Sequence, residues 1–122
     1  MGNTNLNKLK SPKLDRSRKN NLCFVDPPVN LIHTHYFPWF IIPSPGIAQI
    51  LGFLQEKAAD RLDLGYFDGN TYSPLEKDIY ASLADEIRKF GADIVCVSAI
   101  TCAIYPAMYI CHLAKQVNPD IS

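Results

Sequence analysis

The chain lacks the motifs that most directly reveal an enzyme. Its glycines fit neither the GxGxxG nor the P-loop spacing, so no phosphate-binding loop is present. No Ser/His/Asp series and no pair of carboxylates can be placed around a cleft. A phosphorelay receiver needs paired acids after its first strand and an acid after its third, whereas Asp26 stands alone and the third expected strand ends in Ser98. We therefore find no catalytic constellation for an independent small enzyme.

Signals for export or membrane attachment are also missing. No apolar stretch follows Met1, which excludes a secretory signal peptide, and Leu6 stands where N-myristoylation requires Ser or Thr. The most apolar uncharged segment, from Leu31 to Leu54, is broken by prolines, histidines and glycines and is too mixed for a membrane-spanning helix. We expect a cytoplasmic protein that has no membrane partner.

The four cysteines show no CxxC spacing. Metal and iron–sulfur sites use clustered ligands, so we expect no metal ligated by these residues. Cys96 lies in an apolar strand pattern, and Cys102 and Cys111 fall at the start of a helical pattern and within it. Buried free thiols in a reducing cytosol are the simplest interpretation.

Charge is balanced overall but unevenly distributed. Twelve basic residues offset twelve acidic residues, yet the first twenty positions hold six basic residues and one acidic residue, a local charge of +5. Such a basic, Asn-rich tail can attract nucleic acid or an anionic membrane, and it can equally be a solvated leader. We favour the second interpretation, which predicts a disordered tail over residues 1–20 and no nucleic-acid partner.

One segment, residues 92–101, is bounded like a buried strand of a parallel sheet. It reads ADIVCVSAIT. An uninterrupted apolar run from Ile94 to Val97 is followed by two polar residues, Ser98 and Thr101. A strand covered on both faces needs continuous apolar residues rather than alternation, so we expect this strand to be buried on both faces. Two further strands are expected over residues 22–25 and 62–67.

Three helical patterns alternate with these strands. The first covers residues 44–58 and opens with a Ser-Pro pair; the second covers residues 73–90, opens with a Ser-Pro-Leu-Glu capping box and is closed by Gly91. The third covers about residues 104–116. Its expected buried stripe comprises Ala107, Ile110, Cys111, Ala114 and Val117.

The connection over residues 29–43 is unusually long for a βα unit and is rich in aromatic residues. Long loops are often functional, but these aromatics can equally form a flap that packs on the domain, which is the interpretation we favour. His33 and His35 form an HxH pair that could ligate a metal, although no acidic or thiol partner is close in sequence. Packing within the loop is the alternative that we favour.

The order of elements predicts an α/β fold with three βα units and a parallel sheet with right-handed crossovers. Among such folds we favour an incomplete flavodoxin-like, or Rossmann-like, sheet with the strand order 2-1-3. Residues 21–122 would form one domain. Another strand is expected after Ile121, but the sequence stops at Ser122, so we interpret the chain as a fragment or a truncated reading frame. A sheet of three strands would leave an apolar edge open.

An ordered series of short motifs leads to a family resemblance. The first expected strand ends in Asp26-Pro27-Pro28, and the segments PSPGIAQILGFLQEKA and LDLGYFDGN follow it. The stretch over residues 83–121 reads LADEIRKFGADIVCVSAITCAIYPAMYICHLAKQVNPDI. In this order the segments resemble the N-terminal cobalamin (vitamin B12)-binding domain of radical S-adenosylmethionine enzymes, over about residues 22–122.

The resemblance implies that the corrin of cobalamin lies over the carboxyl ends of the parallel strands, with its nucleotide tail inserted toward the sheet. Ser98, Ala99 and Thr101 match the family's hydroxyl motif after the third strand and would line this tail. The alternative is that Ser98 and Thr101 only cap the helix that follows. At neighbouring strand ends the resemblance implies four more cofactor-binding positions: Asp26, Pro27, Pro28 and Asp68.

Three departures from the family pattern limit what the resemblance implies. The DxHxxG motif that supplies a lower cobalt ligand in classical cobalamin domains is absent, because two prolines follow Asp26 and His33 is out of register. The Gly-Gly turn after a fourth strand and the CxxxCxxC cluster motif are absent as well. A [4Fe–4S] cluster and S-adenosylmethionine would belong to a downstream domain, of methyltransferase or cyclase type, that these residues do not include.

Two functions from different classes follow. The first is the cobalamin-binding module of a B12-dependent radical enzyme, which holds the corrin and is not catalytic by itself. The second is a non-catalytic remnant or interaction module, which binds no cofactor and pairs with a partner strand through the open edge of its sheet.

Overall fold

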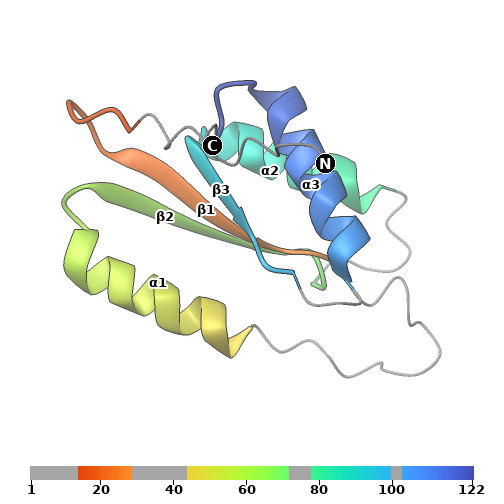
Figure 1. Ribbon diagram of the computed structural model, residues 1–122, viewed down its shortest axis with the longest axis horizontal. Helices are drawn as coiled ribbons and strands as arrows, with labels where there is room; N and C mark the ends of the chain where they lie inside the picture. The colour runs from red at the N-terminus through yellow and green to blue at the C-terminus, as the bar shows by residue number, and fades with distance from the viewer. Residues whose placement is uncertain (1–13, 29–43, 72–77, 100–102) are drawn as a thin grey trace, which may run out of the picture.

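The computed structural model describes residues 14–28, 44–71, 78–99 and 103–122. Strands and helices alternate along these residues, as the sequence pattern predicts (Figure 1). The elements are β1 (Asn20–Asp26), α1 (Pro45–Ala58), β2 (Leu62–Asp68), α2 (Ile79–Phe90), β3 (Ile94–Val97) and α3 (Ile104–Val117). The α/β class and the incomplete flavodoxin-like arrangement are confirmed. None of these helices is long and apolar enough to cross a membrane.

The three strands form one parallel sheet in the order β2-β1-β3, which confirms the predicted order. β1 is the central strand, and its residues from Leu22 to Val25 are buried. β3 lies at the edge, and all four of its residues are only half-buried. The expectation that β3 is buried on both faces is therefore wrong. An apolar run in the sequence predicts a strand. Whether that strand is central or at an edge depends on which strands pair with it, and the run does not predict this.

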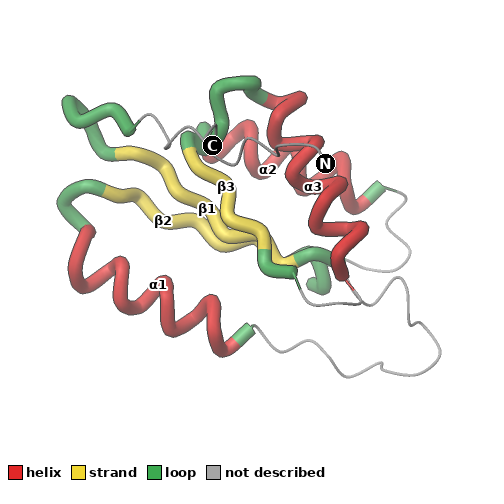
Figure 2. The backbone as a smooth tube through the Cα atoms, in the orientation of Figure 1, coloured by secondary structure: helices red, strands yellow, loops and turns green. Residues whose placement is uncertain are grey.

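Side chains alternate between the two faces of the sheet and form two core clusters. α1 covers one face, and α2 and α3 cover the other, as the tube in Figure 2 shows. The cluster beneath α1 contains Leu22, Phe24 and Ile47, with Leu51, Leu54, Leu62, Leu64, Tyr66, Ile94 and Cys96 packed against it. The cluster beneath α2 and α3 contains Cys23, Val25, Ile79, Leu83, Ile87, Ala92, Ile110, Ala114 and Ile121.

The ends of α2 follow capping chemistry, although the helix starts later than expected. Gly91 adopts φ 65° and ψ 45°, and its N–H donates to the Arg88 carbonyl at 3.1 Å. This left-handed geometry favours glycine and confirms the predicted end of the helix. At the start, the Asp78 carboxylate accepts the N–H of Ala81 at 2.9 Å. The capping box expected over residues 73–76 lies outside the described residues.

The described cysteines are free thiols in three different environments. Cys23 is fully buried, and desolvation, reinforced by neighbouring Cys96, raises its pKa to about 12, so it stays protonated near neutral pH. Cys96 is half-buried on the edge strand. Cys111 is exposed, so its place in the expected buried stripe of α3 is wrong. It lies about 100° around the helix from fully buried Ile110, which turns it away from the sheet.

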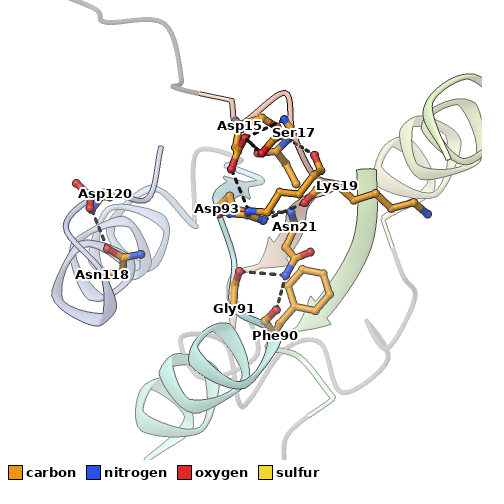
Figure 3. Close-up of polar contacts among 11 residues, drawn as sticks. Asp15, Ser17, Lys19, Asn21, Phe90, Gly91, Asp93, Asn118 and Asp120 are labelled. Atoms are coloured by element: carbon orange, nitrogen blue, oxygen red, sulfur yellow. Dashed lines mark hydrogen bonds and ion pairs between the residues drawn. The ribbon is translucent and has the colours of Figure 1, made fainter. Parts of the chain in front are cut away.

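The segment leading into β1 is anchored to the start of β3 (Figure 3). Arg18 donates through two guanidinium nitrogens to Asp93, at 2.9 and 2.6 Å. Asp93 also accepts the backbone N–H of Asn21 at 2.8 Å. The Asn21 side-chain amide donates to the carbonyls of Phe90 and Gly91, at 2.9 and 3.1 Å, which ties β1 to the end of α2.

The residues before β1 also make local contacts. Asp15 accepts the N–H and the hydroxyl of Ser17, at 2.9 and 2.6 Å, and closes a turn. Asn20 is buried and is already part of β1. The expectation of a disordered tail through residue 20 therefore does not hold for residues 14–20, and residues 1–13 lie outside the described part of the chain.

Candidate site at the carboxyl end of the sheet

Three strand ends bring polar side chains together at one end of the sheet. Asp26, the last residue of β1, is the register partner of Asp68, the last residue of β2. Ser98 directly follows β3, and its N–H donates to the Val25 carbonyl at 3.1 Å. Asp26, Asp68 and Ser98 each stand two residues beyond a side chain that packs toward α1, so alternation places all three on the α1 side of the sheet.

The Asp26 carboxylate is the centre of this group. Its Oδ2 accepts the hydroxyl hydrogen of Tyr66 at 3.0 Å, and its Oδ1 accepts the hydroxyl hydrogen of Ser98. A carboxylate is too weak a base to activate a serine near neutral pH, so this pair is better suited to binding than to nucleophilic catalysis. With its hydrogen directed at Asp26, the Ser98 oxygen presents lone pairs to a ligand and can accept a hydrogen bond.

Tyr66 is fixed in its protonated, donating form. Burial, the hydrogen bond to Asp26 and the nearby charge of Asp68 raise the pKa of Tyr66 far above its ordinary value of 10.0. The backbone of Ser44, just before α1, also bonds to Tyr66 and acts in the opposite direction. The Tyr66 hydroxyl therefore joins the start of α1 to the end of β1 and does not titrate in the physiological range.

The turn after β2 packs tightly against the end of β1. Asp68 Oδ1 accepts the backbone N–H of Asn70 at 2.9 Å, and the Asn70 side-chain amide reaches the Pro27 carbonyl at 3.2 Å. The N–H of Gly69 donates to the Asp26 carbonyl at 2.8 Å. A side chain at residue 69 would place its Cβ 2.7 Å from that carbonyl oxygen. Glycine is required here by this close approach of two backbones.

The structure brings together only part of the expected cofactor-binding set. Asp26, Asp68 and Ser98 lie on the same face of the sheet. Ala99, which follows Ser98, is exposed. Pro27 and Pro28 are fully buried, so they shape the end of β1 and offer little surface to a ligand. Thr101 lies outside the described residues, as do Cys102 and the His33–His35 pair.

The site lies at the switch point of the sheet. The chain leaves β1 toward α1 on one face and leaves β3 toward α3 on the other face. In open α/β sheets this divergence opens a crevice outside the carboxyl ends of the two strands, where ligands bind. The Ser98–Asp26 hydrogen bond joins these same two strand ends.

Sequence reasoning missed Tyr66, Gly69 and Asn70. Tyr66 carries a recognisable signal, because it stands two residues before Asp68 in an alternating strand and therefore shares its face. Gly69 and Asn70 have the composition of a turn, but their contacts reach back to the end of β1 across the sheet, which the sequence does not show.

Metal chemistry has little support within the described ranges, where no group of three or more His, Cys, Asp or Glu side chains could hold an ion. Comparison with protein-family models, with curated proteins and with solved structures finds no match for the chain. The proposal of a function therefore rests on the motif resemblance, on the fold and on the geometry of the strand ends.

Proposed function

We propose that the chain is a cobalamin-binding module of a B12-dependent radical S-adenosylmethionine enzyme. The observation that carries the proposal is the switch point between β1 and β3, where a small, half-buried hydroxyl residue, Ser98, directly follows the edge strand. Flat cofactors bind over this end of parallel sheets. The motif resemblance supplies the identity of the cofactor.

The residues present suit a large planar ligand. Ser98 and Ala99 are small, and Ala99 is exposed, so a ligand can approach the end of β3 closely. Ser98 offers an acceptor oxygen that matches the amide groups around a corrin ring. Asp26 holds Ser98 in place, and Asp68 lies at the neighbouring strand end. Pro27 and Pro28 would act by fixing the backbone, given their burial.

The chemistry would be divided between this module and a partner domain. Bound cobalamin would supply methyl-transfer or radical chemistry, and a downstream domain with a [4Fe–4S] cluster would bind S-adenosylmethionine. The proposal assigns no cobalt ligand to the chain. A reducing cytoplasm fits the free thiols of Cys23, Cys96 and Cys111.

Titration of the full chain with hydroxocobalamin, followed by its visible absorption spectrum, tests the proposal. Ser98→Leu fills the space at the end of β3 and should weaken binding by more than about tenfold, which is roughly 1.4 kcal/mol. Ser98→Ala removes the hydroxyl but keeps the space, and it should weaken binding less. Far-ultraviolet circular dichroism of each variant reports whether the fold survives.

Ser17→Leu is the matched control, because Ser17 is exposed and precedes β1 at the opposite end of the sheet. It should bind like the unmodified chain. If the unmodified chain leaves the cobalamin spectrum unchanged at high protein concentration, the proposal is wrong. If binding occurs and Ser98→Leu matches the control, cobalamin binds elsewhere on the chain.

A further inference from the structure

Two hydroxyl groups hold the Asp26 carboxylate from opposite sides of β1. Tyr66, in β2, donates to Oδ2 at 3.0 Å, and Ser98, which follows β3, donates to Oδ1. β2 and β3 pair with opposite edges of β1, so Tyr66 and Ser98 are separated by that strand and are joined through the carboxylate. The Asp26 side chain is therefore a bridge between two different strand ends.

The bridge leaves the Asp26 carboxylate little freedom to turn. The last torsion of an aspartate side chain has a broad energy well, so a carboxylate held by a single donor can rotate. A second donor on the other oxygen fixes its plane. Asp68 is the register partner of Asp26, and two carboxylates at neighbouring strand ends repel each other. Without Tyr66, the bond from Ser98 alone would have to hold the carboxylate against this repulsion.

Tyr66 is itself well placed to hold the carboxylate. Its ring packs against the core cluster beneath α1. Burial is the largest of the causes that raise the pKa of Tyr66, so the hydroxyl keeps its hydrogen near neutral pH. The bond with the Ser44 backbone favours ionised Tyr66, as expected where an N–H donates to the phenol oxygen. The hydroxyl hydrogen therefore remains available to Asp26.

Ser98 keeps no hydrogen for a ligand while this bridge is in place. Its hydroxyl hydrogen goes to Asp26, because a carboxylate can only accept, and its backbone N–H donates to the Val25 carbonyl at 3.1 Å. The hydroxyl oxygen is thus held as an acceptor in one direction. A rotation of the Asp26 carboxylate would release this oxygen, and a ligand that bonds to it would then have to fix it on binding.

We propose that Tyr66 is a positioning residue for the candidate site: through Asp26 it fixes the direction of the Ser98 hydroxyl and thereby raises the affinity of the site for its ligand. A hydroxyl group that is already fixed loses less freedom when the ligand binds. The inference rests on the proposed function for the nature of the ligand. The positioning of Ser98 by Tyr66 is a property of the chain alone.

The rotamer of Ser98 in the full chain, without ligand, provides the first test. NMR couplings between its α- and β-hydrogens report whether the side chain holds one rotamer or exchanges among three. Tyr66→Phe keeps the ring and removes the hydroxyl, so it should move these couplings toward those of a freely rotating serine. Asp26→Ala removes the bridge and should have the same effect. Tyr80→Phe is the matched control and should change nothing, because Tyr80 is half-buried on the other face of the sheet.

Titration with hydroxocobalamin, followed by its visible absorption spectrum, provides the second test. Tyr66→Phe should weaken binding about fivefold, the usual effect of one hydrogen bond, and Tyr80→Phe should not weaken it. In a Ser98→Ala background, Tyr66→Phe should weaken binding by less than about twofold, because no hydroxyl is left to position. A merely structural role of Tyr66 would give the same loss in both backgrounds. Circular dichroism confirms that each variant is folded.

Two results would overturn the inference. The first is a set of Ser98 couplings that Tyr66→Phe leaves unchanged. The second is an equal loss of affinity with and without the Ser98 hydroxyl, which would show that Tyr66 acts on binding by another route. If the unmodified chain leaves the cobalamin spectrum unchanged, the proposed function is wrong, and the couplings still decide whether Tyr66 positions Ser98.

Discussion

Ser98 donates its hydroxyl hydrogen to Asp26, a residue 72 positions earlier in the chain. The bond joins the end of the edge strand β3 to the end of the central strand β1, at the point where the chain diverges to opposite faces of the sheet. Tyr66, which lies in β2, donates a hydrogen bond to the same carboxylate. One aspartate thus connects the carboxyl ends of all three described strands and holds the residues of the candidate site in fixed positions.

Replacing Asp26 should therefore cost more than replacing either of its donors. Asp26→Ala leaves two hydroxyl groups without their acceptor and should lower the free energy of unfolding by about 1–3 kcal/mol. Tyr66→Phe removes one bond and should cost about 0.5–1.5 kcal/mol. Urea denaturation followed by circular dichroism measures both. Asp60→Ala, at an exposed position between α1 and β2, is the control and should have a negligible effect. An Asp26→Ala variant as stable as this control would contradict the central role of Asp26.

Two glycine-to-alanine changes should shift stability in opposite directions. At Gly69 a Cβ would lie 2.7 Å from the Asp26 carbonyl oxygen and 2.9 Å from Pro28, so the turn must move; we expect a loss of about 1–3 kcal/mol. At Gly52, inside α1, a Cβ meets no atom within 4 Å. Alanine there should raise stability by up to about 1 kcal/mol, because it favours the helix. Thermal and urea unfolding of the two variants measures the contrast, and equal effects would contradict the close packing at Gly69.

Local chemistry made most of the fold predictable. Turn residues and helical periodicity placed most element ends within a few residues, except for the start of α2, and Gly91 ends α2 in a left-handed conformation that favours glycine. The β-α alternation predicted a parallel sheet, whereas the strand order, which the structure confirms, came from the flavodoxin-like interpretation and not from alternation alone. The burial of β3 was predicted wrongly, since an apolar run looks the same in a central strand and at an edge. Cys111 was assigned to the buried stripe because it stands four residues after Ala107 and three before Ala114, but it lies about 100° around the helix from buried Ile110 and is exposed.

The candidate site was predictable only in part. Asp26, Asp68 and Ser98 were expected together, because the carboxyl ends of parallel strands meet at one edge. Their connections were not predictable, since the hydrogen bond from Tyr66 to Asp26 depends on strand register rather than on spacing along the chain. Pro28 was expected to line a cofactor-binding site. Its side chain is fully buried, so it offers little surface to a ligand and instead shapes the backbone at the end of β1.

The Arg18–Asp93 pair should make stability depend on pH in the acidic range. The hydrogen bond from Arg18 holds the pKa of Asp93 below its ordinary value of 3.8, against an opposing effect of burial. A carboxylate whose folded pKa is lowered stabilises the fold above its unfolded pKa, and this contribution is lost as pH falls through the folded value. The ion pair thus contributes at neutral pH and fades below the ordinary value of 3.8.

Arg18→Gln should lower the urea midpoint at neutral pH, and this loss should shrink as the pH falls below 3.8 and Asp93 takes up its proton. Arg88→Gln is the matched control, because Arg88 forms an exposed pair with Asp85 on the surface of α2 and ties no strand to another. Its midpoint should move less at neutral pH, since pairs within one exposed helix contribute little. An Arg18→Gln effect of constant size from neutral pH down through the acidic range would show that Arg18 stabilises the chain by packing rather than through the Asp93 charge.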